Sequence, residues 1–273
     1  MAVGRLLARP RFELVPVGGV DEQFSRLPRA STVTVTCSPR RGLEPTLLLC
    51  ERLASLGFRA VPHLAARLVA SWDHLSTVAE RLGRAGIREI FVIGGDAAKP
   101  SGPYDSALAL LSSLANMGVR FDEVGIAGYP ERHPLIDEGR LRRALVDKQP
   151  FASYLVTQIC YDPTAIVDWI ERQRRAGIRL PLYIGVPGVV NRAKLLKISM
   201  HVGVGGSIRY LRGHRNVLAR LVRRSGYRPD SFVTSIAALL DDAALDVVGF
   251  HINTFNQVEA TERWRQKMLQ EQG

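Results

Sequence analysis

Residues 59–96 read RAVPHLAARLVASWDHLSTVAERLGRAGIREIFVIGGD, and two short apolar runs flank an amphipathic segment in this stretch. The runs at 59–64 and 89–93 are rich in the apolar and β-branched residues typical of buried strands. Between them, residues 76–85 repeat apolar side chains at helical spacing, and Gly86 stands where a helix is expected to stop. Strand, helix and strand in this order predict a βαβ unit with parallel strands.

The same unit recurs along the chain. Strands are predicted at residues 12–16, 32–37, 59–64, 89–93, 123–127, 154–158, 182–186 and 247–252, and helices at 46–56, 76–85, 105–117, 163–176 and 191–201. Gly57, Gly118 and Gly177 follow three of these helices. Eight strands alternating with helices in 273 residues predict one α/β domain over residues 1–273, a (β/α)8 TIM barrel. The long interval 203–244 predicts extra helices between strands seven and eight.

Charge and composition narrow the functional classes. The formal net charge of +11 favours anionic ligands, but no zinc-finger or helix-turn-helix pattern accompanies it, so we expect no nucleic-acid partner. No apolar stretch approaches the roughly 18 residues that span a bilayer, which predicts a cytoplasmic protein without a membrane partner. The three cysteines show no CxxC spacing and predict neither a disulfide framework nor a metal site.

Polar side chains stand at the ends of nearly all the predicted strands. In a (β/α)8 barrel the C-terminal strand ends carry the active site. The polar groups at these positions are Glu13, Thr36, His63, Asp96, Tyr129, Glu131, His133, Gln158, Tyr161, Asp162, His251, Asn253 and Asn256. The pattern predicts a polar ligand site on one rim of the barrel.

Several blocks, in the same order along the chain, resemble the methylenetetrahydrofolate reductase family. Residues 124–134 (VGIAGYPERHP) are similar to the family's GYPExHP block, and residues 12–16 (FELVP) to its FExxPP block. Residues 155–158 (LVTQ) are similar to its ITQ block, Gly95 and Asp96 to the end of its RGD, and residues 249–256 (GFHINTFN) to its HFYTxN. The resemblance implies an oxidoreductase of one-carbon metabolism that serves methionine biosynthesis.

The resemblance also implies a reaction and roles for residues. The family reduces 5,10-methylenetetrahydrofolate to 5-methyltetrahydrofolate through a 5-iminium cation. Glu13 corresponds to the family's acid, and we expect burial to raise its pKa and keep it protonated near neutral pH. Asp96 is the candidate for stabilising the cation. Asp96, Gln158 and Tyr161 correspond to positions that bind the folate.

The cofactor positions are mixed. The cofactor-binding candidates on the rim are Thr36, His63, Gly95, Tyr129 and His133. Flavin-type members carry the arginine of RGD where this chain has Gly94, and the tyrosine of HFYT where it has Asn253. We therefore expect FAD binding to be weakened or absent, with NADH or NADPH delivering hydride directly to the folate. Candidate phosphate partners are Arg67, Lys99 and Arg132.

Three other functions remain open at this point. The chain is alternatively an FAD-dependent reductase that passes electrons through flavin, or a non-catalytic homologue that binds folate without turnover. The net charge alone suggests a binder of nucleic acid or an anionic surface. The same positive field is suited to attract polyglutamylated folate, whose tail is polyanionic.

Overall fold

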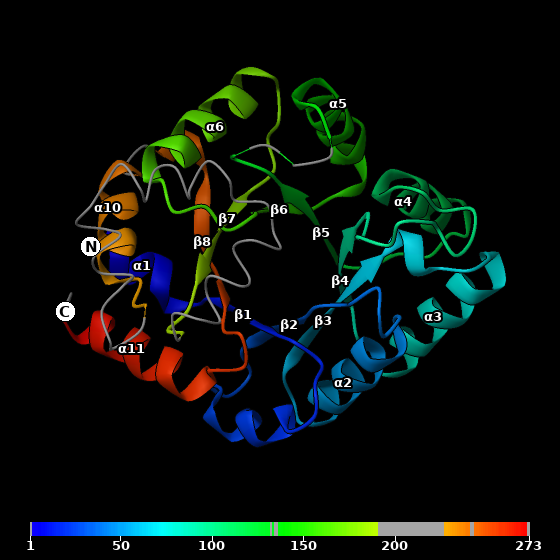
Figure 1. Cartoon of the computed structure of the whole chain (residues 1–273), viewed down its shortest axis with the longest axis horizontal. Helices are drawn as coiled ribbons and strands as arrows, with labels where there is room; N and C mark the ends of the chain where they lie inside the picture. The colour runs from blue at the N-terminus through cyan, green and yellow to red at the C-terminus, as the bar shows by residue number, and fades with distance from the viewer. Residues whose placement is uncertain (1, 132, 134–135, 191–226, 241–242, 272–273) are drawn as a thin grey trace.

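Eight parallel strands form a closed barrel in this computed structural model, which describes residues 2–131, 133, 136–190, 227–240 and 243–271. The strands pair in sequence order, and β8 returns to pair with β1 (Figure 1). The strands are β1 (Arg11–Leu14), β2 (Thr32–Val35), β3 (Arg59–Ala65), β4 (Glu89–Ile93), β5 (Glu123–Gly128), β6 (Tyr154–Thr157), β7 (Leu182–Pro187) and β8 (Val247–Asn253). The predicted TIM barrel is confirmed.

Helices surround the barrel, as Figure 1 shows. The α-helices are α1 (Ala2–Ala8), α2 (Glu44–Ser55), α3 (Trp72–Arg84), α4 (Ala107–Asn116), α5 (Glu138–Lys148), α6 (Pro163–Arg175), α10 (Asp230–Leu239) and α11 (Val258–Gln270), and the 3-10 helices are η1 (Val20–Arg26), η2 (Ala66–Leu68), η3 (Gln149–Phe151) and η4 (Ala243–Leu245). Helix α10 lies between β7 and β8, within the interval where extra helices are predicted, and residues 203–226 of that interval lie outside the described residues. The predicted helix at 191–201 lies outside the described residues. Within the part of the chain that is described, no helix is long and apolar enough to cross a membrane.

Helix α3 shows how the sequence sets these elements. Leu75, Val78, Ala79 and Leu82 are its buried residues, and their spacing places them on one face, toward the core. The helix begins at Trp72, earlier than the predicted residue 76, because the Ser71 hydroxyl accepts a hydrogen bond from the His74 amide and caps it. It ends before Gly86, whose φ of 69° satisfies the expected left-handed stop.

Inside the barrel, alternate residues of the strands point to the axis. Val61, Phe91, Tyr154 and Val156 form one buried cluster there, separate from the larger core between strands and helices. The interior is therefore packed with side chains at mid-height. Polar groups lie on either side of this layer: one set where the strands begin and one toward their C-terminal ends.

Arg11 fills the end of the barrel where the strands begin. Its guanidinium is 4% exposed and pairs with the carboxylate of Glu89, the first residue of β4. It also donates to Glu123 at 3.3 Å and lies between two rings, 4.1 Å from the Tyr154 centroid and 4.5 Å from that of Tyr183. A buried charge destabilises the fold unless an opposite charge pairs with it. We therefore interpret this cluster as a structural ion pair that fills the end of the barrel where the strands begin.

The cysteines lie in structural positions. Cys50 and Cys160 are buried in the core. Burial raises the pKa of the Cys37 thiol to about 12, and the charge of Asp96 adds to the shift. Cys37 therefore stays a thiol at neutral pH, which is unsuitable for a nucleophile.

Strand β7 lies close to Thr157, the last residue of β6, at Gly185. A Cβ added there would lie 2.2 Å from the backbone oxygen of Thr157, and the Gly185 amide donates to the Thr157 hydroxyl at 2.9 Å. We expect Gly185→Ala to lower the free energy of unfolding by about 1–3 kcal/mol, because the two strands must move apart.

Denaturant unfolding followed by circular dichroism measures this effect. The matched control is Gly83→Ala in the exposed part of α3, where no heavy atom lies within 4 Å of the added Cβ. The control is expected to stabilise the protein by about 0.5–1 kcal/mol, since alanine favours the helix. Equal effects from the two substitutions would show that the contact at Gly185 is not restrictive.

Candidate active site

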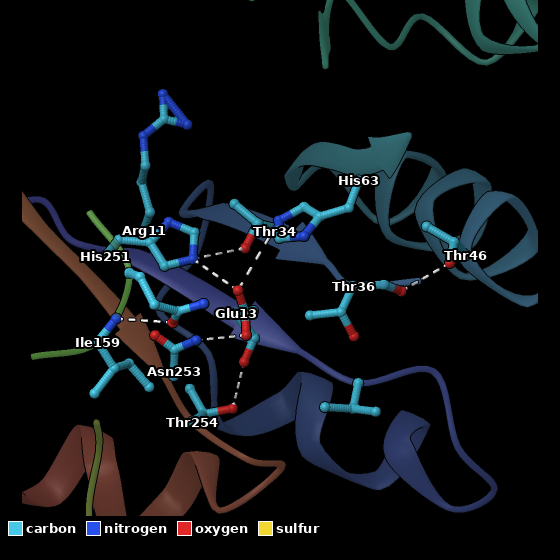
Figure 2. Close-up of polar contacts among 12 residues, drawn as sticks. Arg11, Glu13, Thr34, Thr36, Thr46, His63, Ile159, His251, Asn253 and Thr254 are labelled. Atoms are coloured by element: carbon cyan, nitrogen blue, oxygen red, sulfur yellow. Dashed lines mark hydrogen bonds and ion pairs between the residues drawn. The ribbon is translucent and has the colours of Figure 1, made fainter. Parts of the chain in front are cut away.

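Glu13 lies at the centre of a hydrogen-bonded cluster toward the C-terminal end of β1. Its Oε2 is 3.0 Å from Nε2 of His251, and its Oε1 accepts a hydrogen bond of 2.5 Å from the Asn253 amide (Figure 2). The Thr254 hydroxyl donates to the backbone oxygen of Glu13 at 2.6 Å. The side chain is 14% exposed, so the carboxylate is fixed yet reachable from the rim.

Closure of the barrel brings these residues together. β1 and β8 are parallel neighbours, with Glu13 opposite Asn253 and Arg11 opposite His251. Because alternate strand residues share a face, Glu13, His251 and Asn253 all point inward. Thr34 of β2 is opposite Glu13 on the other side, and its hydroxyl lies 3.4 Å from Nε2 of His251.

The charge state of Glu13 differs from the sequence expectation. Burial acts to raise the pKa of this carboxyl, as expected. The hydrogen bond from His251, the charges of His251 and His63 and the hydrogen bond from Asn253 together outweigh burial, and the pKa of Glu13 is lowered. The expectation of a raised pKa is therefore wrong: with this rim open to water, Glu13 is a carboxylate.

His63 of β3 faces the same carboxylate. Its Nε2 is 4.0 Å from Oε2 of Glu13, and its ring packs on Phe91 with centroids 4.7 Å apart. Burial lowers the pKa of His63 to about 4, although the charge of Glu13 acts in the opposite direction. His63 is thus a neutral imidazole at neutral pH. The structure places this predicted cofactor residue beside the predicted acid.

Asp96 belongs to a second group on the rim. It is exposed in the loop after β4. Its negative charge acts on Tyr129 and His133 after β5: burial and then Asp96 raise the pKa of Tyr129 to about 12, and burial lowers the pKa of His133 despite Asp96. The Tyr129 and His133 rings meet edge to face, with centroids 5.1 Å apart.

Gly95 shapes the loop that carries Asp96. Its φ of 88° is in the left-handed region, and an added Cβ would lie 2.8 Å from the Cβ of Ala65. Arg67 holds the same loop, since its guanidinium donates to the backbone oxygens of Ala97, Ala98 and Asp105. Gly95 and Arg67 therefore have structural roles beyond the ligand contacts predicted for them.

Gln158 and Tyr161 follow β6. The side-chain oxygen of Gln158 accepts a hydrogen bond of 2.8 Å from the Ile159 amide, which fixes the half-buried side chain. Tyr161 is buried, and its ring packs edge to face on that of Tyr227. The structure thus keeps Gln158 near the rim, whereas Tyr161 packs into the fold.

Thr36 and Asn256 make hydrogen bonds that join neighbouring elements of the barrel. The backbone oxygen of Thr36 accepts a hydrogen bond from Thr46 of α2, and its side chain is partly exposed. Asn256 bonds both the amide and the carbonyl oxygen of Val15 and so joins the loops after β8 and β1. Lys99 is exposed, and Arg132 lies outside the described residues.

Two residues of β8 act on Glu13 in ways that the sequence did not reveal. His251 was recognised only as a polar rim residue, and Asn253 only as a departure from the family pattern. Both contact the Glu13 carboxylate. The inward alternation of β8 was a usable signal, but it required knowing that Asn253 pairs with Glu13.

Comparisons with known proteins identify the family of the chain. A family model described as methylenetetrahydrofolate reductase matches residues 20–268. Methylenetetrahydrofolate reductase 1 of Schizosaccharomyces pombe is 26% identical over 148 residues, which are 48% of this chain and 24% of that protein. Methylenetetrahydrofolate reductase 2 of Saccharomyces cerevisiae is 24% identical over 163 residues, 56% of this chain and 27% of that protein. Each match spans about a quarter of the curated relative.

A solved structure shows the same fold. A protein described as a deoxyribose-phosphate aldolase from Toxoplasma gondii ME49 superposes with a TM-score of 0.53 at 10% identity, over 100% of this chain and 98% of that one. At this identity the likeness concerns the barrel alone.

Proposed function

Because the chain belongs to the methylenetetrahydrofolate reductase family, we propose that it reduces 5,10-methylenetetrahydrofolate to 5-methyltetrahydrofolate with hydride from NADH or NADPH. The observation that carries this proposal is the Glu13 carboxylate, held by His251 and Asn253 where β1 and β8 meet. The reaction begins with protonation of a ring nitrogen, and Glu13 and His251 are side chains able to carry and transfer a proton.

The lowered pKa of Glu13 changes how the proton is stored. Nε2 of His251 and Oε2 of Glu13 are 3.0 Å apart and share a hydrogen bond. A proton can therefore pass between the imidazole and the carboxylate, and Glu13 need not carry it before the substrate binds. When substrate covers the rim, it removes the remaining water from a side chain that is 14% exposed. Burial then acts more strongly to raise the pKa of Glu13 and favours transfer of the proton to the carboxyl.

The chemical step follows from this placement. The proton of the pair moves from Glu13 to N10 of the folate as the bond between N10 and the methylene carbon breaks, leaving the 5-iminium cation. Asp96, exposed on the rim, offers negative charge to that cation, and the fixed amide of Gln158 offers hydrogen bonds to the pterin. NADH or NADPH supplies the hydride that converts the methylene carbon to a methyl group and is itself oxidised to the nicotinamide cation.

The cations near the rim support direct hydride transfer without a tightly bound flavin. A dinucleotide needs partners for its phosphates. The guanidinium of Arg67 donates hydrogen bonds to three backbone oxygens of the protein. Gly94 stands where flavin-type members have an arginine. Tyr129 and His133 remain as a ring pair on which a nicotinamide can stack. A hydride donor that binds and leaves fits this surface better than a resident flavin.

An assay without flavin tests this function. Purified protein is incubated with NADH and 5,10-methylenetetrahydrofolate, and the loss of nicotinamide absorbance is followed. We expect NADH to be consumed only when the folate is present, and the protein to show no visible flavin band. A stoichiometric flavin band, or turnover that begins only after FAD is added, would overturn the direct transfer. Folate binding without turnover under either condition would identify a non-catalytic homologue.

A further inference from the structure

Three side chains at the centre of the site have the arrangement of metal ligands. Glu13, His63 and His251 each present one ligand atom, and these atoms all lie within 4.8 Å of one another. Oε2 of Glu13 is 3.0 Å from Nε2 of His251 and 4.0 Å from Nε2 of His63. In a tetrahedral site with bonds of about 2.0–2.1 Å, ligand atoms are roughly 3.3–3.5 Å apart. The two measured distances lie on either side of this value.

His63 adds a second observation at this site. Its side chain is 7% exposed, and its Nε2 is buried without a hydrogen-bond partner among the residues described. Such an atom carries a cost in free energy unless something pairs with it. With a proton on Nδ1, the Nε2 lone pair would face Oε2 of Glu13, 4.0 Å away. A cation between the two atoms would satisfy both.

The surroundings hold the carboxylate in a suitable orientation. Asn253 donates to Oε1 of Glu13 at 2.5 Å, which leaves Oε2 facing both imidazoles. Outer contacts of this kind orient ligands in metal sites. Nδ1 of His251 is buried and has no partner within the described ranges. It can therefore take the proton when Nε2 becomes a ligand.

We propose that Glu13, His63 and His251 bind one divalent transition-metal ion such as Zn²⁺, with water as the fourth ligand. Two imidazoles and one carboxylate suit Zn²⁺ and Co²⁺ better than Mg²⁺ or Ca²⁺, which prefer oxygen ligands. The sequence predicted no metal site, because it lacks paired cysteines and because Glu13 and His251, which meet only when the barrel closes, are 238 residues apart.

The ion also changes the reaction, and this second consequence rests on the proposed function. A metal on Oε2 of Glu13 occupies the atom that pairs with His251 and displaces the proton that the reaction needs. Metal binding and proton storage at Glu13 are then mutually exclusive, so Zn²⁺ is a reversible inhibitor of the reductase.

Metal titration tests the site directly. Protein freed of metal with a chelator is titrated with Co²⁺, whose visible absorption is strong in tetrahedral sites, and Zn²⁺ is then added to displace it. We expect one equivalent to bind. Glu13→Gln, His63→Gln and His251→Gln should each weaken binding by at least about 100-fold, since loss of a ligand costs no less than loss of an outer contact. The control His74→Gln, on α3, should bind as the wild type does.

Thermal unfolding reports on metal binding to the folded protein, and inhibition of reduction reports on activity. Zn²⁺ should raise the Tm of the wild type but not that of Glu13→Gln, which replaces the carboxylate with a side chain of the same size. Co²⁺ binding that is equal in wild type and in Glu13→Gln, or no binding at equimolar Co²⁺, would overturn the site. Inhibition of reduction by Zn²⁺ at the same stoichiometry supports the second consequence. A protein that binds Co²⁺ and lacks reductase activity would retain the metal site while refuting the proposed function.

Discussion

Glu13→Gln is expected to lower kcat/KM for reduction of 5,10-methylenetetrahydrofolate by about 100- to 10,000-fold, the usual range for loss of a general acid. Glutamine keeps the size of the side chain and can still accept the hydrogen bond from Asn253. It cannot carry the proton that Glu13 shares with His251. The loss should therefore fall on the chemical step, with folate affinity nearly unchanged.

Two measurements separate these effects. Nicotinamide absorbance gives kcat/KM, and isothermal titration with folate gives Kd. The control Glu259→Gln removes a carboxylate that is 50% exposed on α11 and should leave both values unchanged. If Glu13→Gln retains full activity, the assignment of the acid is wrong. If the substitution removes folate binding instead, Glu13 is a binding residue and the proton comes from elsewhere.

Arg11→Met is expected to lower the free energy of unfolding by about 3–5 kcal/mol, because it leaves the buried Glu89 carboxylate with only the exposed guanidinium of Arg59, 3.6 Å away, as counter-charge. Glu89 is 8% exposed and pairs with Arg11, and methionine replaces the arginine stem without its guanidinium. Replacement also removes the contacts of the guanidinium with the Tyr154 and Tyr183 rings. The double variant Arg11→Met/Glu89→Leu should recover most of the loss, since no unpaired charge then remains.

Denaturant unfolding measures all three proteins. The control Arg263→Met breaks an ion pair with Glu259 in which the side chains are 75% and 50% exposed. An exposed pair of this kind contributes about 1 kcal/mol or less. A loss from Arg11→Met no larger than that of the control would show that water reaches the barrel floor.

The barrel was predictable from the sequence because its cause is local. Each buried parallel strand is a short apolar run, and a glycine follows the four helices α2, α3, α4 and α6. Gly57, Gly86, Gly118 and Gly177 all have positive φ, as expected. Helix α11 was not predicted, because its buried residues alternate with many charged ones and no glycine follows within the described chain.

The site was predictable only in part, because its chemistry depends on which strands meet. Resemblance to a family predicted Glu13 as the candidate acid, but reasoning from burial alone predicted the wrong direction for its pKa. Contacts with His251 and Asn253 on β8 lower the pKa of Glu13. Their effect on Glu13 follows from the register of β8 against β1, which a strand's own sequence does not reveal.

The pairing of β1 with β8 also determines when the acid acquires its environment during folding. Contacts between residues 238 positions apart form late, because closing so long a loop costs entropy before any contact compensates for it. Until β8 docks, Glu13 is a solvated carboxylate with an ordinary acidity and β1 has an open edge. The proposed acid therefore gains its partners on β8 only when the barrel closes, and a chain stalled before that step would hold most of the strands without this cluster.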